Sequence, residues 1–318
     1  MSENTPPSSP SAAPAIAGPP AARSAGASPW LAFAGCCAIW GSTFLVISIG
    51  NDALDPLWAA AVRLGLAALI LFPLSLLAGQ RIRDRASLAS ALRYGLLQMG
   101  INFALLYWGE KTVPSGIAAV CYATTPLSSA LMASALRLER LSWLKLLGAG
   151  VALAGVAMIG RGSGTTHTPL PGFLAILGAA TVAALGNTLL KRGPKVPALA
   201  VNAVGCAVGC AICLALSRLI GERWVVPREP VALFSIIYLT LAGSVGAFVL
   251  MTWLVMRWPV TRVSFVSVVV PVVAMVLGAV FRHDPVTVAS LAGSALVLAG
   301  WACGLAADRR QAATSSGH

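Results

Sequence analysis

The side chains of this chain that could do chemistry are few, and most of them interrupt long apolar runs. Arg63 lies inside the run 57–78, where a guanidinium could snorkel to an interface, gate a pathway or hold an anionic ligand such as a carboxylate. Gln98 and Asn102 are four residues apart, which places two amides on one face of a helix. They could bond a neighbouring helix or a polar ligand, and the spacing leaves both roles open.

Small polar residues interrupt two further apolar runs. The segment CAIWGSTFLVISIG carries Ser42 and Thr43 in its middle, just after Trp40, and a later run carries Asn187 and Thr188. Polar groups inside an apolar helix either bond neighbouring helices or face a polar cavity. We expect these five residues to border a cavity.

Two prolines, Pro126 and Pro271, fall in the middle of apolar runs, where a proline removes one backbone hydrogen bond and kinks a helix. The freed carbonyl becomes available to a ligand or to a neighbouring hydroxyl. The prolines therefore predict hinges beside a cavity. Hydroxyl-bearing residues close to them complete the candidate lining: Tyr122, Thr125, Ser128, Ser264 and Ser267.

The composition indicates which elements hold these residues. The 318-residue chain is 58% hydrophobic and 10% charged, whereas a soluble protein carries about 25% charged residues. Because so few charges cannot cover a water-facing surface, we expect an all-α integral membrane protein with the lipid bilayer as a partner. The net charge of +12 does not indicate a nucleic-acid partner, because the basic residues lie mostly in short loops beside apolar runs.

A membrane-spanning helix needs about 20 mostly apolar residues. The sequence predicts ten of them: 31–50, 57–78, 90–109, 112–135, 143–160, 171–190, 197–217, 231–256, 263–281 and 285–307. The ends of the third and fifth are the least defined, because Arg93 and Lys145 fall within them. With a cytoplasmic N-terminus, inside segments collect 15 of the 22 basic residues and outside segments 6, although the outside loop 218–230 holds three arginines. This asymmetry predicts a multi-pass protein of the cell membrane with both termini cytoplasmic.

The sequence also repeats itself at a distance of 145 residues. In this register Pro126 falls on Pro271, Trp108 on Trp253 and Phe103 on Phe248. A repeat of five helices crosses the membrane an odd number of times, so the second copy must enter the membrane from the opposite side. Inverted repeats are typical of secondary transporters, which bind substrate between the halves. The predicted organisation is a disordered tail (1–29), a first repeat (30–161), a second repeat (171–307) and a short tail (308–318).

Catalytic or metal-binding machinery is not visible in the sequence. There is no GxxxxGK[ST] or HExxH motif, and the seven cysteines all lie in apolar runs. Cys206, Cys210 and Cys213 share a helical face and could hold a soft metal, but no histidine or acidic residue joins them, so packing is preferred. We expect no enzyme, no cofactor and no metal. The acidic residue nearest to a span core is Glu110, so a proton relay and facilitated exchange both stay open.

Several segments resemble a known family. WGSTF (40–44) resembles the first-helix signature of the EamA type within the drug/metabolite transporter superfamily, and AAVRLGLAALIL (60–71) resembles its second helix, with Arg63 at the usual arginine position. Residues 107–156 and 263–300 resemble the best-defined part of each repeat. The resemblance implies a ten-helix carrier with a central cavity lined mainly by helices 1, 3, 4, 6, 8 and 9. Asp284-Pro285 departs from the family, which usually has a glutamate before a non-proline residue.

The predicted function is export of small organic metabolites, amino acids or related compounds above all, by alternating access. A carrier of nucleotide sugars or sugar phosphates is an alternative, although such cargo calls for more cationic cavity residues than Arg63. A non-transporting scaffold or sensor is another, but it gives no reason for matched prolines in both halves. Substrate identity, transport direction and the choice between monomer and homodimer are left open.

Overall fold

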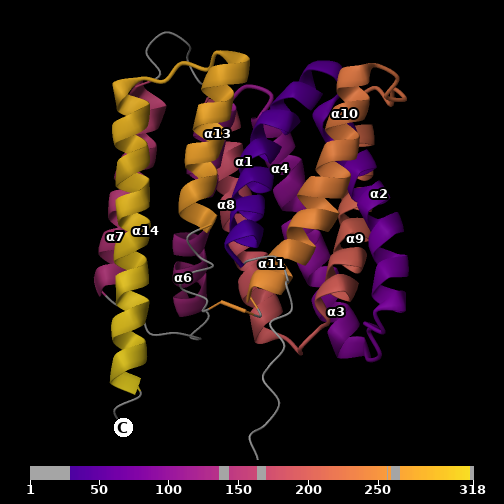
Figure 1. The fold of residues 1–318 in the computed structure, drawn as a ribbon, viewed down its shortest axis with the longest axis horizontal. Coiled ribbons are helices and arrows are strands. Elements are labelled where there is room, and N and C mark those ends of the chain that lie inside the picture. Colours follow the sequence, from indigo (N-terminus) through magenta and orange to yellow (C-terminus); the bar gives the residue numbers. More distant parts are fainter. Residues whose placement is uncertain (1–28, 136–142, 163–169, 256, 259–265, 316–318) are drawn as a thin grey trace, which may run out of the picture.

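The computed structural model describes residues 29–135, 143–162, 170–255, 257–258 and 266–315, and the regular elements within these ranges are helices (Figure 1). The first half contains α1 (Pro29–Ala53), α2 (Pro56–Leu77), α3 (Arg85–Tyr94), the π-helix η1 (Gly95–Ile101), α4 (Asn102–Gly109), α5 (Ser115–Tyr122), α6 (Thr125–Ala135) and α7 (Trp143–Gly162). The second half contains α8 (Leu170–Arg192), α9 (Ala198–Leu219), α10 (Pro230–Tyr238), the π-helix η2 (Leu239–Gly246), α11 (Ala247–Val255), α13 (Val266–Arg282) and α14 (Val288–Ser315).

Five helices in the described ranges are long and apolar enough to cross a membrane, namely α1, α2, α8, α9 and the continuous helix that begins with α10. Large apolar side chains such as Leu69, Leu77, Leu153 and Phe281 are exposed on the outside of the bundle. An exposed apolar surface of this extent suits lipid and not water. The prediction of an all-α membrane protein is therefore confirmed.

Two helices extend five residues or more beyond the apolar runs that predict them. The third begins at Arg85 and not at residue 90, because Asp84 accepts a 2.7 Å hydrogen bond from the backbone N–H of Ser87 and so caps a polar first turn. The last continues to Ser315, beyond the predicted end at 307. Hydropathy thus marks the apolar part of a helix, whereas its ends depend on caps and backbone hydrogen bonds.

The two halves repeat one another, as the sequence predicts. The π-helix η1 spans residues 95–101, and residues 240–246, which lie 145 positions later, fall within η2. The chain rises from α3 to α4 in Figure 1 and descends from α10 to α11, so these equivalent helices run in opposite directions. A π-turn is uncommon and often lies at a functional site, which makes its occurrence in both halves a strong mark of the repeat.

Pro126 does not kink a continuous helix, which corrects the prediction of a mid-helix hinge at this residue. The chain breaks after Tyr122, and Pro126 is the second residue of the new helix α6. A missing N–H is tolerated there because the first turn of a helix has no internal acceptor for it. At the break, the hydroxyls of Thr124 and Thr125 donate to the carbonyls of Cys121 and Tyr122. Pro271, by contrast, lies inside α13.

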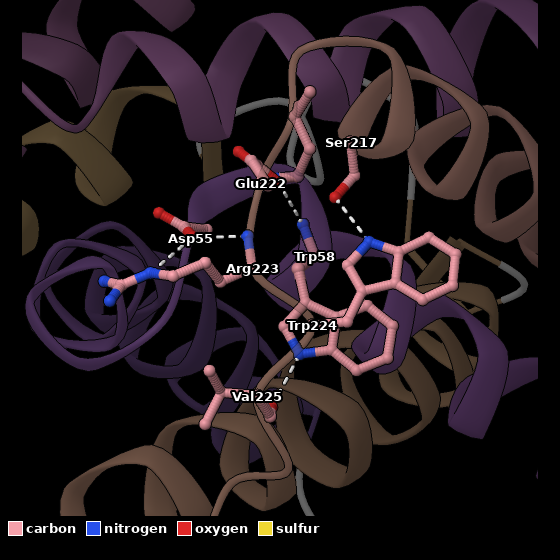
Figure 2. Close-up of polar contacts among 8 residues, drawn as sticks. Asp55, Trp58, Ser217, Glu222, Arg223, Trp224 and Val225 are labelled. Carbon is pink, nitrogen blue, oxygen red and sulfur yellow. Dashed lines mark hydrogen bonds and ion pairs between the residues drawn. The ribbon is translucent and has the colours of Figure 1, made fainter.

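The second helix of each repeat is capped by the other repeat. The carboxylate of Glu222, in the loop after α9, accepts hydrogen bonds from the backbone N–H groups of Leu57 and Trp58 at 3.1 and 2.8 Å (Figure 2). At the start of α9, the backbone N–H of Leu199 donates to Oε1 of Gln80, in the loop after α2, at 2.9 Å. Because α2 and α9 also pack along their length, the two repeats are joined at both ends of this helix pair.

Further contacts at the Glu222 end form what we call the clasp, which comprises Asp55, Trp58, Glu222, Arg223 and Trp224. Asp55 accepts from the backbone N–H of Arg223 at 2.9 Å and lies 3.9 Å from its guanidinium. The indole rings of Trp58 and Trp224 stack with centroids 5.3 Å apart. Figure 2 shows these groups converging from α2 and the loop after α9. The clasp gives a structural role to Arg223, one of the three arginines in the loop 218–230.

Helices α7 and α14 pack face to face and lie side by side at the left of Figure 1. Their contact depends on glycines: a Cβ at Gly155 would lie 2.5 Å from the carbonyl oxygen of Gly293, and one at Gly300 would lie 2.3 Å from that of Gly148. Close backbone approach through small residues is a common way for helices to associate in lipid. Gly150 faces open space and plays no part in this contact.

Gly155→Ala should destabilise the α7–α14 pair by about 1–3 kcal/mol, the usual cost of overpacking a tight interior. The measurement is the midpoint of thermal unfolding in detergent micelles, which should fall. Gly150→Ala on the same helix is the matched control, because nothing lies within 4 Å of its added Cβ. Its midpoint should stay unchanged or rise slightly, since alanine favours a helix. Equal shifts in both variants would contradict the packing account.

Glu222→Ala should lower the free energy of unfolding by about 1–2 kcal/mol, because it leaves two N–H groups at the start of α2 without an acceptor. The thermal midpoint in detergent reports the loss. Glu229→Ala serves as control, because Glu229 precedes α10 without a side-chain capping bond. A midpoint as high for Glu222→Ala as for the control would show that the cap contributes nothing.

Candidate functional site

A cavity of about 510 Å³ lies between the two repeats. This volume falls within the roughly 300–1,000 Å³ of small-molecule sites. Six aromatic side chains contribute to its wall: Trp40, Phe44, Tyr94, Phe103, Tyr122 and Phe248. The polar side chains in the wall are Thr43, Arg63, Gln98, Thr125, Ser129 and Asn187.

The lining follows the sequence repeat. Gln98 and Gly243 are separated by 145 residues, and both line the cavity from the π-helices of the two halves. The same separation relates Phe103 to Phe248, Leu106 to Met251 and Thr125 to Val270, and all six of these residues line it too. Because equivalent positions of both repeats face one space, the cavity lies on the pseudo-symmetry axis that relates them.

Arg63 is buried in the cavity wall and does not snorkel, since only 4% of its surface is exposed. Its Nε donates to Oγ of Ser244 and its Nη1 to Oη of Tyr107, both at 3.1 Å. The guanidinium carbon also lies 5.0 Å from the ring centroid of Phe103, a cation–π distance. Ser244 belongs to η2 and Tyr107 to α4, so Arg63 joins the two repeats beside the cavity.

The amides of η1 and α4 form a second polar cluster. Asn102 is fully buried, donates to the carbonyl of Gln98 at 2.8 Å and accepts from the hydroxyl of Tyr122 at 3.2 Å. Asn102 therefore positions the ring of Tyr122, while the side-chain oxygen of Gln98 has no hydrogen-bond partner. The structure therefore leaves one buried acceptor unsatisfied beside the cavity.

Most of the predicted site residues lie in one region, but not all of them face the cavity. Trp40, Thr43, Arg63, Gln98, Tyr122, Thr125, Asn187 and Pro271 line it. Ser42 bonds the hydroxyl of Tyr238 at 2.6 Å, and Thr188 bonds the carbonyl of Ala184 at 2.8 Å. Asn102 lies behind the wall, and Ser129 lines the cavity where its neighbour Ser128 does not. Ser264 and the side chain of Ser267 lie outside the described residues.

Sequence reasoning missed several apolar and aromatic members of the wall, notably Phe44, Tyr94, Phe103, Phe248 and Met251. It searched for polar residues inside apolar runs, and aromatic residues give no such signal. The repeat could have found Phe103 and Phe248, because two phenylalanines in register inside an inverted repeat are candidates for a shared cavity.

The side chains of the described wall can bind a ligand through charge, hydrogen bonds and aromatic faces. Arg63 is the one ionisable group in the described wall that carries a permanent charge, and no carboxylate is among the lining residues. In the described ranges, no group of three or more histidine, cysteine or acidic side chains is placed to hold a metal ion. A guanidinium and six aromatic rings suit a small organic anion or zwitterion with an apolar body.

Fold and cavity together define a multi-pass membrane protein with two repeated halves and an internal binding site. The chain belongs to the EamA-like transporter family, whose family model matches residues 28–161 and again residues 170–304. A solved crystal structure has the same fold, with a TM-score of 0.63 at 22% identity, over 89% of this chain and 98% of its own. The family is described as one of transporters.

Named relatives are similar over most of their length. The chain is 28% identical to the uncharacterized inner membrane transporter YedA of Escherichia coli K12, over 76% of this chain and 78% of the relative. It is 27% identical to a probable amino-acid metabolite efflux pump of Salmonella typhimurium, over 82% and 89% of the two chains. It is 30% identical to a probable terminal-alkyne amino-acid exporter of Streptantibioticus cattleyicolor, over 82% and 88%.

Proposed function

We propose that this protein exports small organic metabolites, amino acids or related compounds in particular, across the cytoplasmic membrane by alternating access. The observation that carries the proposal is a cavity of about 510 Å³ at the junction of the repeats with Arg63 as its charged residue. Two relatives, named as a probable amino-acid metabolite efflux pump and a probable terminal-alkyne amino-acid exporter, support the substrate class.

An amino acid would use the groups of the wall as follows. Its carboxylate bonds the guanidinium of Arg63, which has two donors engaged by Ser244 and Tyr107 and others free. Its ammonium lies against the faces of the aromatic rings. Its side chain lies against Phe103 and Phe248. The mixture of one charge and many rings favours amino acids with apolar or aromatic side chains.

Nucleotide sugars and sugar phosphates fit this wall less well. A phosphate carries more negative charge than a carboxylate, and recognition of it normally uses several cationic side chains. The described wall supplies Arg63 alone. A non-transporting scaffold or sensor would have no use for an internal cavity that follows the symmetry of the repeats.

Alternating access gives the ends of the bundle distinct roles. We propose that all ten predicted spans cross the membrane with both termini cytoplasmic, so that the clasp lies outside. In the described state the clasp and the Asp52–Arg282 ion pair join the repeats at this end. Ser129 of α6, Met251 of α11 and Val266 at the start of α13 also line the cavity. We take the described state to be that of a carrier closed at the clasp end.

Purified protein in liposomes should exchange radiolabelled amino acids, offered as a mixed pool, with saturable kinetics. Arg63→Gln should lower this exchange at least about tenfold, because a hydrogen bond to a charged group contributes about 1.5–3 kcal/mol. Arg218→Gln removes an exposed arginine far from the cavity and is the matched control. No saturable exchange by the unmodified protein, or equal exchange by both variants, would contradict the proposal.

Locking the clasp should stop transport. In Asp55→Cys combined with Arg223→Cys, a short thiol-reactive cross-linker joins α2 to the loop after α9, so flux in liposomes should fall to background. A cross-linker with an internal disulfide allows the flux to be restored by reduction. Each single variant, treated in the same way, controls for reaction at native cysteines. Full flux through the cross-linked protein would show that this end need not open.

A further inference from the structure

Gly243 is a residue of the cavity wall whose backbone does not call for a glycine. It lies inside the π-helix η2 and lines the cavity. A glycine inside a helix is less favourable than an alanine, because it loses more backbone freedom on folding. A positive φ angle would explain its presence, but the glycines with a positive φ in the described ranges are Gly79 and Gly221. The reason for glycine at position 243 therefore lies in what surrounds its missing side chain.

The neighbours of this missing side chain are the guanidinium of Arg63 and the methyl group of Thr43. A Cβ at Gly243 would lie 3.1 Å from Nη2 of Arg63 and 3.0 Å from Cγ2 of Thr43. Both distances are shorter than the roughly 3.5–4.0 Å of ordinary non-bonded contacts. A side chain at position 243 would therefore force one of its two neighbours to move. Since all three residues line the cavity, this tight place belongs to the wall itself.

The other parts of the guanidinium are already held in place. Its Nε donates to Ser244, the residue after Gly243, and its Nη1 donates to Tyr107. The ring of Phe103 lies 5.0 Å from the guanidinium carbon. The N–H groups of Nη2 take part in neither of these hydrogen bonds. The contacts thus fix the orientation of Arg63 and place Nη2 beside the residue that has no side chain.

The repeat shows that Gly243 is matched to Arg63. The position 145 residues after Arg63 holds Val208, and the position 145 residues before Gly243 holds Gln98. One half therefore combines a long residue of the second helix with a glycine of the opposite π-helix, and the other half combines a short one with a glutamine. Val208 likewise packs against the opposite π-helix, where a Cβ at Gly95 would lie 2.9 Å from its own Cβ. The glycine occurs on the side where the arginine needs the space.

We propose that Gly243 is a specificity-determining residue, which selects substrates with a carboxylate because it keeps Nη2 of Arg63 uncovered; this rests on the proposed transport function. The carboxylate approaches Nη2 past the α-carbon of Gly243 and accepts a charge-assisted hydrogen bond there. Glycine allows such a close approach of a ligand to the backbone. No carboxylate is among the lining residues of the described wall, so no protein anion competes for this nitrogen.

The test uses full-length protein in liposomes and the amino acid that exchanges fastest in a mixed radiolabelled pool. Exchange of this label is inhibited with the unlabelled amino acid and, separately, with its carboxamide, which has nearly the same shape but no negative charge. The readout is the ratio of the two half-inhibiting concentrations. For the unmodified protein the amide should require a concentration at least about tenfold higher, because it loses a hydrogen bond between two charged groups.

Gly243→Ala should raise the half-inhibiting concentration of the amino acid roughly threefold or more, because the displaced or covered Nη2 bonds a carboxylate less well. The value for the amide should stay the same, so the ratio falls. The maximal exchange rate should change little, because the lost interaction is one of binding. Gly178→Ala is the matched control. It adds the same methyl group outside the cavity wall, 3.5 Å from Cδ1 of Leu105, and should keep the ratio of the unmodified protein.

Gly243→Ala combined with Thr43→Ser distinguishes the two neighbours and also serves if the single variant does not fold. Serine keeps the hydroxyl, which in Thr43 donates to the carbonyl of Trp40 at 2.6 Å, but it lacks Cγ2. The added methyl group then has room on this side, whereas its 3.1 Å approach to Nη2 of Arg63 remains. The double variant should therefore fold and keep the lowered ratio.

A ratio for Gly243→Ala as high as that of the unmodified protein would overturn the inference. A normal ratio in the double variant would do the same, because Gly243 would then only make room for Thr43. If the amide inhibits the unmodified protein as well as the amino acid does, the carboxylate does not bind at Nη2, and the inference fails while transport stands. No exchange at all would contradict transport itself, and the inference with it.

Discussion

The start of each second helix is the constraint on which the rest of the architecture depends. A helix begins with backbone N–H groups that have no internal acceptor, so another group has to supply one. Asp55 precedes α2 but is engaged with Arg223, so Glu222 of the other repeat supplies the acceptor. Gln80 does the same for α9. Each repeat therefore completes the other, and α2 and α9 are held as one pair.

This pairing sets the geometry of the site. Arg63 lies about two turns after the capped start of α2, where Ser244 of the second repeat and Tyr107 of the first can both reach it. The π-helices η1 and η2 bring Gln98 and Gly243 to the same cavity from opposite halves. Among the described residues, the two ends of the α2–α9 pair differ. The Glu222 end has a carboxylate with two hydrogen bonds, an ion pair and stacked indoles, whereas the contact identified at the Gln80 end is one amide hydrogen bond.

That difference has a mechanistic consequence. A carrier must exchange the contacts at one end for contacts at the other, and the more strongly joined end is the one that stays closed without a ligand. In our proposal the clasp keeps the outer end shut until a substrate occupies the cavity beside Arg63.

Much of this could be predicted from the sequence, because composition and repeat register are properties of the chain itself. The 145-residue register predicted the two halves, and the intramembrane position of Arg63 drew attention to the residue that joins them. The break after Tyr122 was not foreseen, since Thr124 and Thr125 satisfy the freed carbonyls locally. The sequence did not predict the cap from Glu222 either, because Leu57, which donates to it, lies 165 residues away.

The remaining differences between the predicted and the observed cavity lining arise where residues of one apolar run lie on different faces of the same helix. Thr43 faces the cavity while Ser42, one position earlier, turns about 100° away and bonds Tyr238. The sequence does not tell how a helix is rotated about its own axis, so it cannot predict which of two adjacent polar residues faces the cavity. The contacts of α1 with α10 and α13 fix the rotation of α1.

Reciprocal movement of the two ends is the central claim, and pulsed electron paramagnetic resonance measures it directly. Spin labels at Lys111 and Glu229 report the clasp end, and labels at Arg83 and Lys195 report the opposite end; all four side chains are exposed. When a transported amino acid is added, the clasp-end distance should gain a longer population while the opposite end gains a shorter one. Both ends lengthening together, or neither changing, would contradict alternating access between these repeats.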